Sequence, residues 1–326
     1  MIPLSISYLT KHDPLSRAKH FLSPALSTTM QSVSVGEHDL TMGGDHLVEL
    51  RESSDILDDP AALRERLAED SYLFVKGFHD PDLVREARSD VLDHMAEEGL
   101  LDPDEPVEDA VVHPEYFGDE FDMSATSWTH YPNLRELVEG EEIMTFFERF
   151  LDEKPLALDR KLGRAKATGG FTGFHVDRIF MGRGTDRLYT VWQPIGDCPL
   201  EMGPLVVCPG SHRHDRLRET YGQIDVDRDP VEEMFSEDPH DVIETLGGPL
   251  ATADFEAGDA LIFGQHLLHG SLTNQTDRFR ISVDTRYQSV ENPVDGRWVG
   301  SDPIGHYEWP HDDPTPMEQL RDEWGL

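Results

Sequence analysis

The second half of the chain is a succession of short apolar segments separated by Gly, Pro and Asp, and this pattern limits the possible folds most strongly. From Lys154 onward we expect strands at residues 156–159, 173–180, 188–194, 205–208, 260–263 and 280–287. Many short strands divided by turn residues are typical of a barrel or jelly roll, not of a sheet with alternating helices. We therefore expect a jelly-roll core, a double-stranded β-helix like that of the cupins, over residues 155–290.

The first half reads as helical. Asp59-Pro60 is a helix start signal, and a longer helix from Pro81 carries apolar residues on one stripe. A further helical pair is expected over residues 133–151, after an acidic, proline-containing loop at residues 102–131. The predicted fold class is therefore mainly β with flanking helices and a helical N-terminal part.

No linker rich in Gly, Ser and Pro divides the chain after its first forty or so residues, so we expect a single domain over residues 45–326. Residues 1–44 differ from the rest. Their Ser- and Thr-rich stretch at residues 23–34 shows little periodic burial, which predicts a disordered N-terminal arm.

The composition is strongly acidic: 28 Lys and Arg stand against 65 Asp and Glu, a formal net charge of −37. Such a charge repels phosphate backbones, so we expect no nucleic-acid partner. Acidic residues spread along the whole chain favour adaptation to concentrated salt, with an ordinary acidic protein as the alternative. No apolar run is long enough to span a membrane, and the N-terminus lacks an export signal, so we expect a cytoplasmic protein with no membrane partner.

The residues Phe174-His175-Val176-Asp177 carry the clearest chemical signal. On a strand, His175 and Asp177 point to the same side, where an imidazole and a carboxylate can occupy adjacent positions of one metal ion. The candidate third ligand is His269, in the sequence His-Gly-Ser. Two histidines and one carboxylate leave three metal positions open, the arrangement of non-haem Fe(II) oxygenases. Taken alone, the His-x-Asp pair is also compatible with a hydrogen-bonded His–Asp pair.

Six blocks of sequence, in order, resemble the phytanoyl-CoA dioxygenase family of Fe(II)/2-oxoglutarate oxygenases. They are GFHVD at 173–177, LYTVWQPIGD at 188–197, EMGPLVVCPGSH at 201–212, FEAGDALIF at 255–263, HGSLTN at 269–274 and RFRISVDTRY at 278–287. The resemblance implies that His175, Asp177 and His269 bind Fe(II). It also implies that 2-oxoglutarate and O2 are consumed, with release of succinate and CO2 and hydroxylation of a substrate.

The resemblance also assigns the co-substrate site. Arg280 stands eleven residues after His269, where the family has the arginine that pairs with the distal carboxylate of 2-oxoglutarate. A guanidinium suits this role because its charge is permanent and its donors match a carboxylate in pairs. Ser271 matches a serine that bonds the same carboxylate, and Trp192 matches a residue that lines the co-substrate pocket. Asp177 implies hydroxylation, since halogenating relatives replace this carboxylate by a small residue.

Several residues compete for these roles. His266 lies three residues before His269, and on a strand only one of the two can face the metal. Arg278 lies on the same strand face as Arg280 but nearer the turn. The sequence context around His269 and the spacing to Arg280 favour His269 and Arg280.

Candidate substrate contacts are Lys166, His130, His212 and Arg286. Lys166 and His130 are chosen from position alone. His212 reads as an exposed turn histidine or a substrate contact, and Arg286 as a structural residue or a substrate contact.

The sequence thus predicts a 2-oxoglutarate-dependent hydroxylase of a small or medium organic molecule, with its oligomeric state left open. One alternative is a non-catalytic metal-binding barrel, against which Arg280 and Ser271 argue because such a barrel needs no dicarboxylate anchor. The other is a cupin-type dioxygenase that does not use 2-oxoglutarate, against which Asp177 argues because those sites gather three or four histidines.

Overall fold

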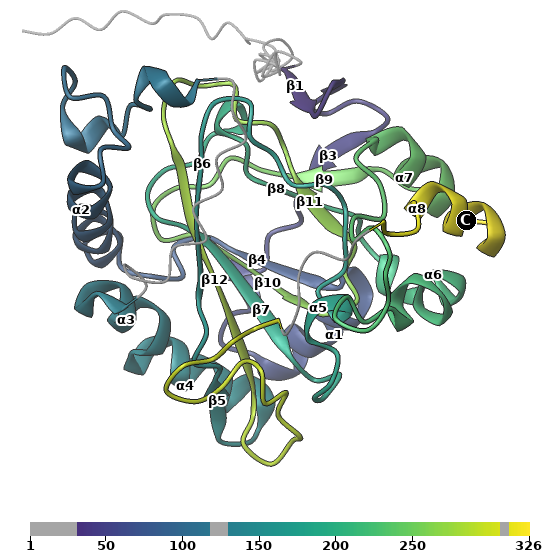
Figure 1. Cartoon of the computed structure of the whole chain (residues 1–326). Coiled ribbons are helices and arrows are strands. Elements are labelled where there is room, and N and C mark those ends of the chain that lie inside the picture. Colours follow the sequence, from purple (N-terminus) through teal and green to yellow (C-terminus); the bar gives the residue numbers. More distant parts are fainter. Residues whose placement is uncertain (1–30, 118–129, 307–312) are drawn as a thin grey trace, which may run out of the picture.

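The computed structural model describes residues 31–117, 130–306 and 313–326, and two β-sheets form the centre of this part (Figure 1). The larger sheet has the order β4-β10-β7-β12-β5, with β6 also paired to β12. Its strands are β4 (Tyr72–Val75), β5 (Pro155–Ala157), β6 (Leu162–Lys166), β7 (Tyr189–Pro194), β10 (Ala260–Gly264) and β12 (Arg280–Ser289). The smaller sheet has the order β11-β8-β9-β3. Its strands are β3 (Leu47–Glu49), β8 (Leu205–Val207), β9 (Leu250–Thr252) and β11 (His269–Ser271).

The two sheets face each other as the halves of a jelly roll. Trp192 and Leu261 of the larger sheet share one buried cluster with Leu205 and Val207 of the smaller sheet. Among the named strands of these two sheets, every pairing is antiparallel except that of β3 with β9. The predicted fold class, a mainly β jelly roll with flanking helices, is confirmed.

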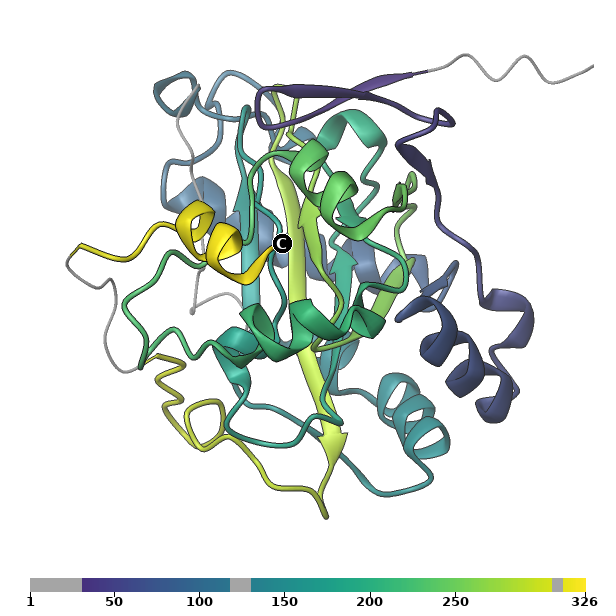
Figure 2. The same cartoon turned by 90° about the vertical axis from the view of Figure 1, so that its right-hand side faces the viewer.

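Helices cover the outer faces of both sheets. Those before the barrel are α1 (Pro60–Asp70), α2 (Pro81–Glu97), α3 (Pro132–Glu139) and α4 (Glu141–Leu151), and they pack on the larger sheet. The later ones are α5 (Arg178–Met181), α6 (Asp215–Glu219), α7 (Pro239–Leu246) and α8 (Met317–Trp324). Of these, α6, α7 and α8 lie in front of the smaller sheet in Figure 2. No helix in the described ranges is long and apolar enough to cross a membrane.

Three of these helices begin at an Asp-Pro pair. Asp59, Asp80 and Asp238 each accept a backbone N–H of the first turn through the side chain, and proline takes the next position. Proline suits this position because its missing N–H is not needed there and its backbone angle is already helical. The helix starts expected at Asp59-Pro60 and Pro81 are confirmed.

Strand β12 separates the apolar outer layer from a polar interior. All ten of its residues are buried, although every second one is polar or charged. Ile281 and Val283 pack with α2 and α3, so Arg280, Ser282 and Arg286 project to the opposite side, into the barrel. The alternation that defines a strand therefore places basic side chains inside the fold.

The strand expected at residues 173–180 is wrong. Only Phe174 and His175 pair with neighbouring segments, through isolated bridges to Ser236 and His269, and helix α5 then begins after Asp177. The apolar pattern misleads here because Val176 and Ile179, three residues apart, are both buried, which also fits a helical turn.

The disordered arm expected over residues 1–44 does not hold for residues 31–44. Strands β1 (Ser32–Val35) and β2 (His38–Thr41) form a hairpin, and Val33, Val35 and Leu40 are buried in the cluster beneath it. Short apolar stretches gain order from the surface they cover, which their own sequence does not reveal. Residues 1–30 lie outside the described part of the chain. The single domain over residues 45–326 stays a prediction.

A close backbone contact lies under β11. A Cβ atom at Gly270 would stand 2.8 Å from the carbonyl oxygen of Thr172. We expect Gly270→Ala to lower the free energy of unfolding by about 1–3 kcal/mol, because the neighbouring backbone must move apart.

Gly264, at the end of β10, is the matched control, since its added Cβ would meet nothing within 4 Å. Gly264→Ala is expected to change the free energy of unfolding by less than about 0.5 kcal/mol. Urea unfolding of the two variants measures the difference, and equal effects would contradict the close contact.

Candidate metal centre and adjoining cavity

Three buried side chains from two segments converge inside the barrel: His175 and Asp177 from the stretch before α5, and His269 from β11. His175 and His269 sit opposite each other and exchange both backbone hydrogen bonds, with N–O distances of 2.8 and 2.9 Å. Their ring centroids are 4.3 Å apart. Asp177 stands at the start of α5, where the chain turns, and its Oδ1 lies 3.9 Å from Nε2 of each histidine.

The backbone fixes which ring nitrogen of each histidine faces the centre. Nδ1 of His175 lies 2.9 Å from the carbonyl oxygen of Gly173, and Nδ1 of His269 lies 3.0 Å from that of Leu267. A carbonyl only accepts, so Nδ1 carries the proton and Nε2 keeps its lone pair. Both Nε2 atoms therefore face Asp177 as metal-binding donors, oriented by the bonds that histidine ligands usually make.

Two side chains hold the other oxygen of Asp177. Thr190 on β7 donates its hydroxyl to Oδ2, and Nη2 of Arg286 on β12 lies 3.2 Å from the same atom. Oδ1 is left to face the histidines. Burial raises the pKa of Asp177, but the charge of Arg286, the two neighbouring histidines and the hydrogen bond from Thr190 together outweigh burial and hold that pKa below its ordinary value. The carboxylate therefore stays ionised inside the fold.

Burial, followed by the proximity of His269, lowers the pKa of His175 to about 3. A neutral imidazole and an ionised carboxylate are the protonation states that bind a divalent cation. Two nitrogens and one oxygen gathered on one side of a common point fit Fe(II) and leave positions for a co-substrate and O2. The residues present therefore fit the group that the sequence predicts.

Arg280 is buried and does not line the cavity that adjoins the metal centre. It is 2% exposed, and its Nη1 donates to Ser282 Oγ at 2.6 Å. Its guanidinium carbon stands 5.9 Å from the ring of Trp192. Trp192 is also buried, and its Nε1 donor has no hydrogen-bond partner among the described residues. Ser271 is fully buried, and its hydroxyl accepts the backbone N–H of Thr172 at 2.9 Å.

A cavity of about 460 Å³ opens onto His175 and Asp177. Lys166 and Arg286, two of the expected substrate contacts, line it. The remaining wall combines basic, acidic and apolar groups: Arg160, Leu162, Arg164, Phe171, Thr172, Gly173, Phe180, Met181, Glu233, Met234, Glu237, Trp298 and His306. Such a mixture suits an organic molecule with both an apolar body and a charged group.

The other two expected substrate contacts do not line this cavity. His130 lines a separate depression of about 230 Å³. His212 stands in the turn after β8, with Nε2 3.1 Å from the carbonyl oxygen of Ala68. Of the two rivals, His266 stands 3.9 Å from Asp186, and Arg278 pairs with Asp109 at 3.2 Å.

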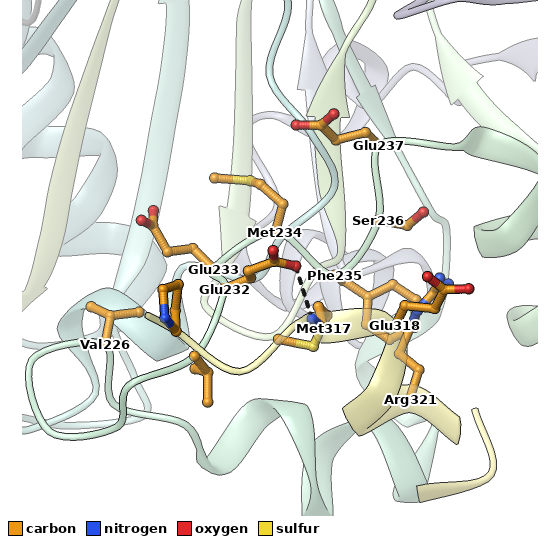
Figure 3. A pocket seen from close by; sticks show the side chains of 12 residues that line it. Val226, Glu232, Glu233, Met234, Phe235, Ser236, Glu237, Met317, Glu318 and Arg321 are labelled. Carbon is orange, nitrogen blue, oxygen red and sulfur yellow. Dashed lines mark hydrogen bonds between the residues drawn. The ribbon is translucent and has the colours of Figure 1, made fainter. Parts of the chain in front are cut away.

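A second hollow, of about 580 Å³, adjoins the cavity. Glu233, Met234 and Glu237 line both hollows. Figure 3 shows them on the same stretch of chain as Glu232, whose carboxylate accepts the backbone N–H of Met317. Burial raises the pKa of Glu233 from 4.5 to about 7. A carboxyl group beside the metal cavity therefore changes charge near neutral pH.

Sequence reasoning missed Thr190 and the contact of Arg286 with Asp177. Only the pairing of β7 with β12 reveals both contacts, because its register places Thr190 opposite Arg286. It also missed the wall residues Glu233 and Met234, which follow a segment without a regular pattern. Nothing in their local sequence indicates that this segment returns to the metal centre.

Known proteins with similar sequences identify the family to which this metal centre belongs. The chain matches the family described as phytanoyl-CoA dioxygenase (PhyH) over residues 67–282. It is 27% identical over 264 residues to a 1-deoxypentalenic acid 11-beta-hydroxylase of Streptomyces exfoliatus, covering 76% of this chain and 88% of that protein. The protein of the same name from Streptomyces arenae is 26% identical over 253 residues, covering 73% and 84%.

Solved structures share the fold at low sequence identity. The epimerase SnoN, solved with Fe3+, alpha ketoglutarate and nogalamycin RO, has a TM-score of 0.52 at 20% identity and covers 79% of this chain and 99% of its own. EctD from S. alaskensis, solved with 2-oxoglutarate and 5-hydroxyectoine, has a TM-score of 0.51 at 18% identity, covering 76% and 82%. The family match spans most of the barrel and both metal-ligand segments. This chain belongs to the phytanoyl-CoA dioxygenase family and is an Fe(II)- and 2-oxoglutarate-dependent oxygenase.

Proposed function

We propose that this dioxygenase hydroxylates a small or medium-sized organic acid, with iron held by His175, Asp177 and His269. The observation that carries the assignment is the buried cluster of these three side chains, whose donor atoms all lie within 4.8 Å of one another. Each ligand has its own orienting contact: Gly173 for His175, Leu267 for His269, and Thr190 with Arg286 for Asp177.

Arg280 is the proposed partner of the distal carboxylate of 2-oxoglutarate. A buried guanidinium suits a dianion, because it stays charged where other bases would lose their proton. The indole N–H of Trp192 lies on the neighbouring strand and has no acceptor among the described residues, and a ligand carboxylate would supply one. We assign Ser271 to the same site: its hydroxyl oxygen accepts the backbone N–H of Thr172, and its O–H would donate to the carboxylate.

When bound, Fe(II) and 2-oxoglutarate supply the oxidation of a substrate C–H bond by O2, with succinate and CO2 as co-products. The chain's own residues orient the reactants and keep out water. Thr190 and Arg286 hold Asp177 ionised and turned toward the histidines. Since Asp177 occupies a position that a halide would need, we propose hydroxylation and not halogenation.

The cavity supports an acid as substrate. Arg160, Lys166 and Arg286 give it basic groups, while Phe171 and Trp298 supply apolar surface. The relatives from Streptomyces are named as hydroxylases of a carboxylic acid, 1-deoxypentalenic acid. A panel of cyclic carboxylic acids and their methyl esters, assayed for succinate release, tests this. Equal release with acids and esters would contradict the proposed substrate class.

His269→Ala is expected to lower bound iron and succinate formation by more than about 100-fold, because the cation loses one of three protein ligands. His266→Ala is the matched control: it removes a histidine three residues away that faces Asp186. Iron content and succinate release are measured on both proteins. If neither variant forms succinate while both keep their iron, a non-catalytic barrel becomes the better description.

Arg280→Lys is expected to raise the KM for 2-oxoglutarate by about 10- to 100-fold. Lysine keeps the charge but loses the paired donors, and hydrogen bonds to charged groups contribute about 1.5–3 kcal/mol. Arg278→Lys, two residues before β12 and paired with Asp109, is expected to leave this KM within about twofold. A similar rise in both variants would contradict the assignment of Arg280.

Glu233 is expected to make substrate binding depend on pH. Its pKa of about 7 means that it becomes negative as the pH rises through neutrality, adding repulsion for an anionic substrate. We expect the KM for an acidic substrate to rise between about pH 6 and about pH 8, and Glu233→Gln to remove this rise.

The free energy of unfolding is also expected to fall as the pH rises. The folded protein holds the Glu233 proton more tightly than the unfolded chain, so this group's contribution to stability is lost as the pH rises from 4.5 through about 7. Glu232→Gln is the matched control, since Glu232 lines only the second hollow and glutamine still accepts the Met317 N–H. An unchanged pH profile in Glu233→Gln would contradict this role.

We also propose a cytoplasmic location, and we propose a salt-adapted host, which the net charge of −37 supports. Raising KCl from about 0.1 M to about 1 M shortens the screening length from about 10 Å to about 3 Å, which relieves self-repulsion. The melting temperature is therefore expected to rise with KCl. Sucrose is the control for general exclusion effects, and a melting temperature that is flat or falls with KCl would contradict salt adaptation.

A further inference from the structure

A second group of metal-binding side chains lies outside the active site: His38, Asp238 and His240. His38 is on strand β2 of the N-terminal hairpin, Asp238 caps helix α7, and His240 is in the first turn of that helix. One ligand atom from each lies within 4.8 Å of the other two, the same spacing limit that the iron triad meets. The proposed function uses none of the three.

The spacing within this group is that of ligands and not of a hydrogen bond. Nε2 of His38 and Oδ2 of Asp238 are 3.6 Å apart, beyond the usual hydrogen-bond range. Two donors each about 2.0–2.1 Å from a shared zinc ion in tetrahedral geometry stand about 3.4 Å apart. In the iron triad the corresponding His-to-Asp distances are 3.9 Å. The His38–Asp238 pair is therefore at least as close as the His–Asp pairs of the iron triad, and all three outer ligand atoms meet the same 4.8 Å limit.

Local contacts orient these side chains and leave Oδ2 of Asp238 available to bind a metal. Oδ1 of Asp238 accepts the backbone N–H of His240 at 2.8 Å, which leaves Oδ2 turned toward His38. The ring of His240 meets those of His38 and His46 edge-on, at centroid distances of 5.7 and 5.9 Å. His38 and Asp238 are about one-third exposed, so an ion can reach them from solvent.

We infer that His38, Asp238 and His240 form a second metal site, selective for a late first-row divalent cation such as Zn²⁺. Imidazole nitrogens favour such ions over Mg²⁺ and Ca²⁺, which prefer sites made only of oxygen. The chain's strongly negative field adds attraction for any cation, while the two histidines supply the selectivity.

A metal here would join two segments distant in sequence. The hairpin β1–β2 would be tied to the start of α7, directly after the stretch that lines the metal cavity. Ser236, two residues before Asp238, accepts the backbone N–H of Phe174, the neighbour of the iron ligand His175. The ion would thus fix the hairpin against the outer side of the active-site wall, a structural role and not a catalytic one.

Zn²⁺ binding to the untagged full-length protein, measured by equilibrium dialysis and metal analysis, tests the site. The wild type is expected to bind two ions per chain above background, and His38→Ala and His269→Ala one each. The double variant gives the background set by the chain's other histidines. His113→Ala, which removes a histidine of another turn, is expected to keep both ions.

Asp238→Asn is the variant that separates metal binding from folding, because asparagine still caps a helix but is a weaker ligand. It is expected to weaken the second ion at least about tenfold while α7 stays folded. Hydrogen exchange of residues 32–41 gives an independent readout: Zn²⁺ should slow it in the wild type and not in His38→Ala.

Equal Zn²⁺ stoichiometry in the wild type and His38→Ala would overturn the second site. So would equal protection of the hairpin by Mg²⁺, since this would show general attraction of cations to an acidic surface. Iron-dependent succinate release in His38→Ala is expected to match the wild type. Failure of this proposal is therefore distinguishable from failure of the catalytic assignment.

Discussion

The active site depends on one backbone bridge, the pair of hydrogen bonds between His175 and His269. This bridge stands where a jelly roll would have a complete strand beside β11, and it fixes two metal ligands relative to each other before any metal binds. Because the pairing is so short, the chain is free to turn immediately afterwards, and that turn brings Asp177 back to the same point. A longer strand would keep the chain extended and carry it away from the centre.

The fold can bury these charged side chains because they form ion pairs. Arg286 pairs with Asp177, and Arg164 pairs with Asp284 at 2.8 Å, all contributed by strand or turn positions that face inward. Removing one member of such a pair leaves a buried charge uncompensated, which costs far more than the pair itself contributes. The same arrangement that permits burial also keeps Asp177 ionised, so the demands of folding and of metal binding coincide.

Much of the fold and the candidate metal ligands were predictable from the sequence, because turn residues, helix caps and the His-x-Asp pair at His175 and Asp177 are local signals, while His269 followed from the family resemblance. The role of Arg280 is implied by the family resemblance and stays a prediction. Local signals failed at residues 173–180, where Val176 and Ile179 fit a strand and a helical turn equally. They failed again at Glu233 and Met234, and at the β1–β2 hairpin. In those places the structure is decided by the surface a segment covers, which depends on residues far away in the chain.

Met234 lines both the metal cavity and the hollow beside it, so a flexible thioether forms part of the partition between two spaces of about 460 and 580 Å³. A methionine side chain rotates at little cost and adapts to irregular shapes. The length of the molecule that fits beside the metal ligands therefore depends in part on the conformation of the Met234 side chain. A smaller side chain at this position would join the two spaces, with the barrel, the metal ligands and Arg280 left as they are.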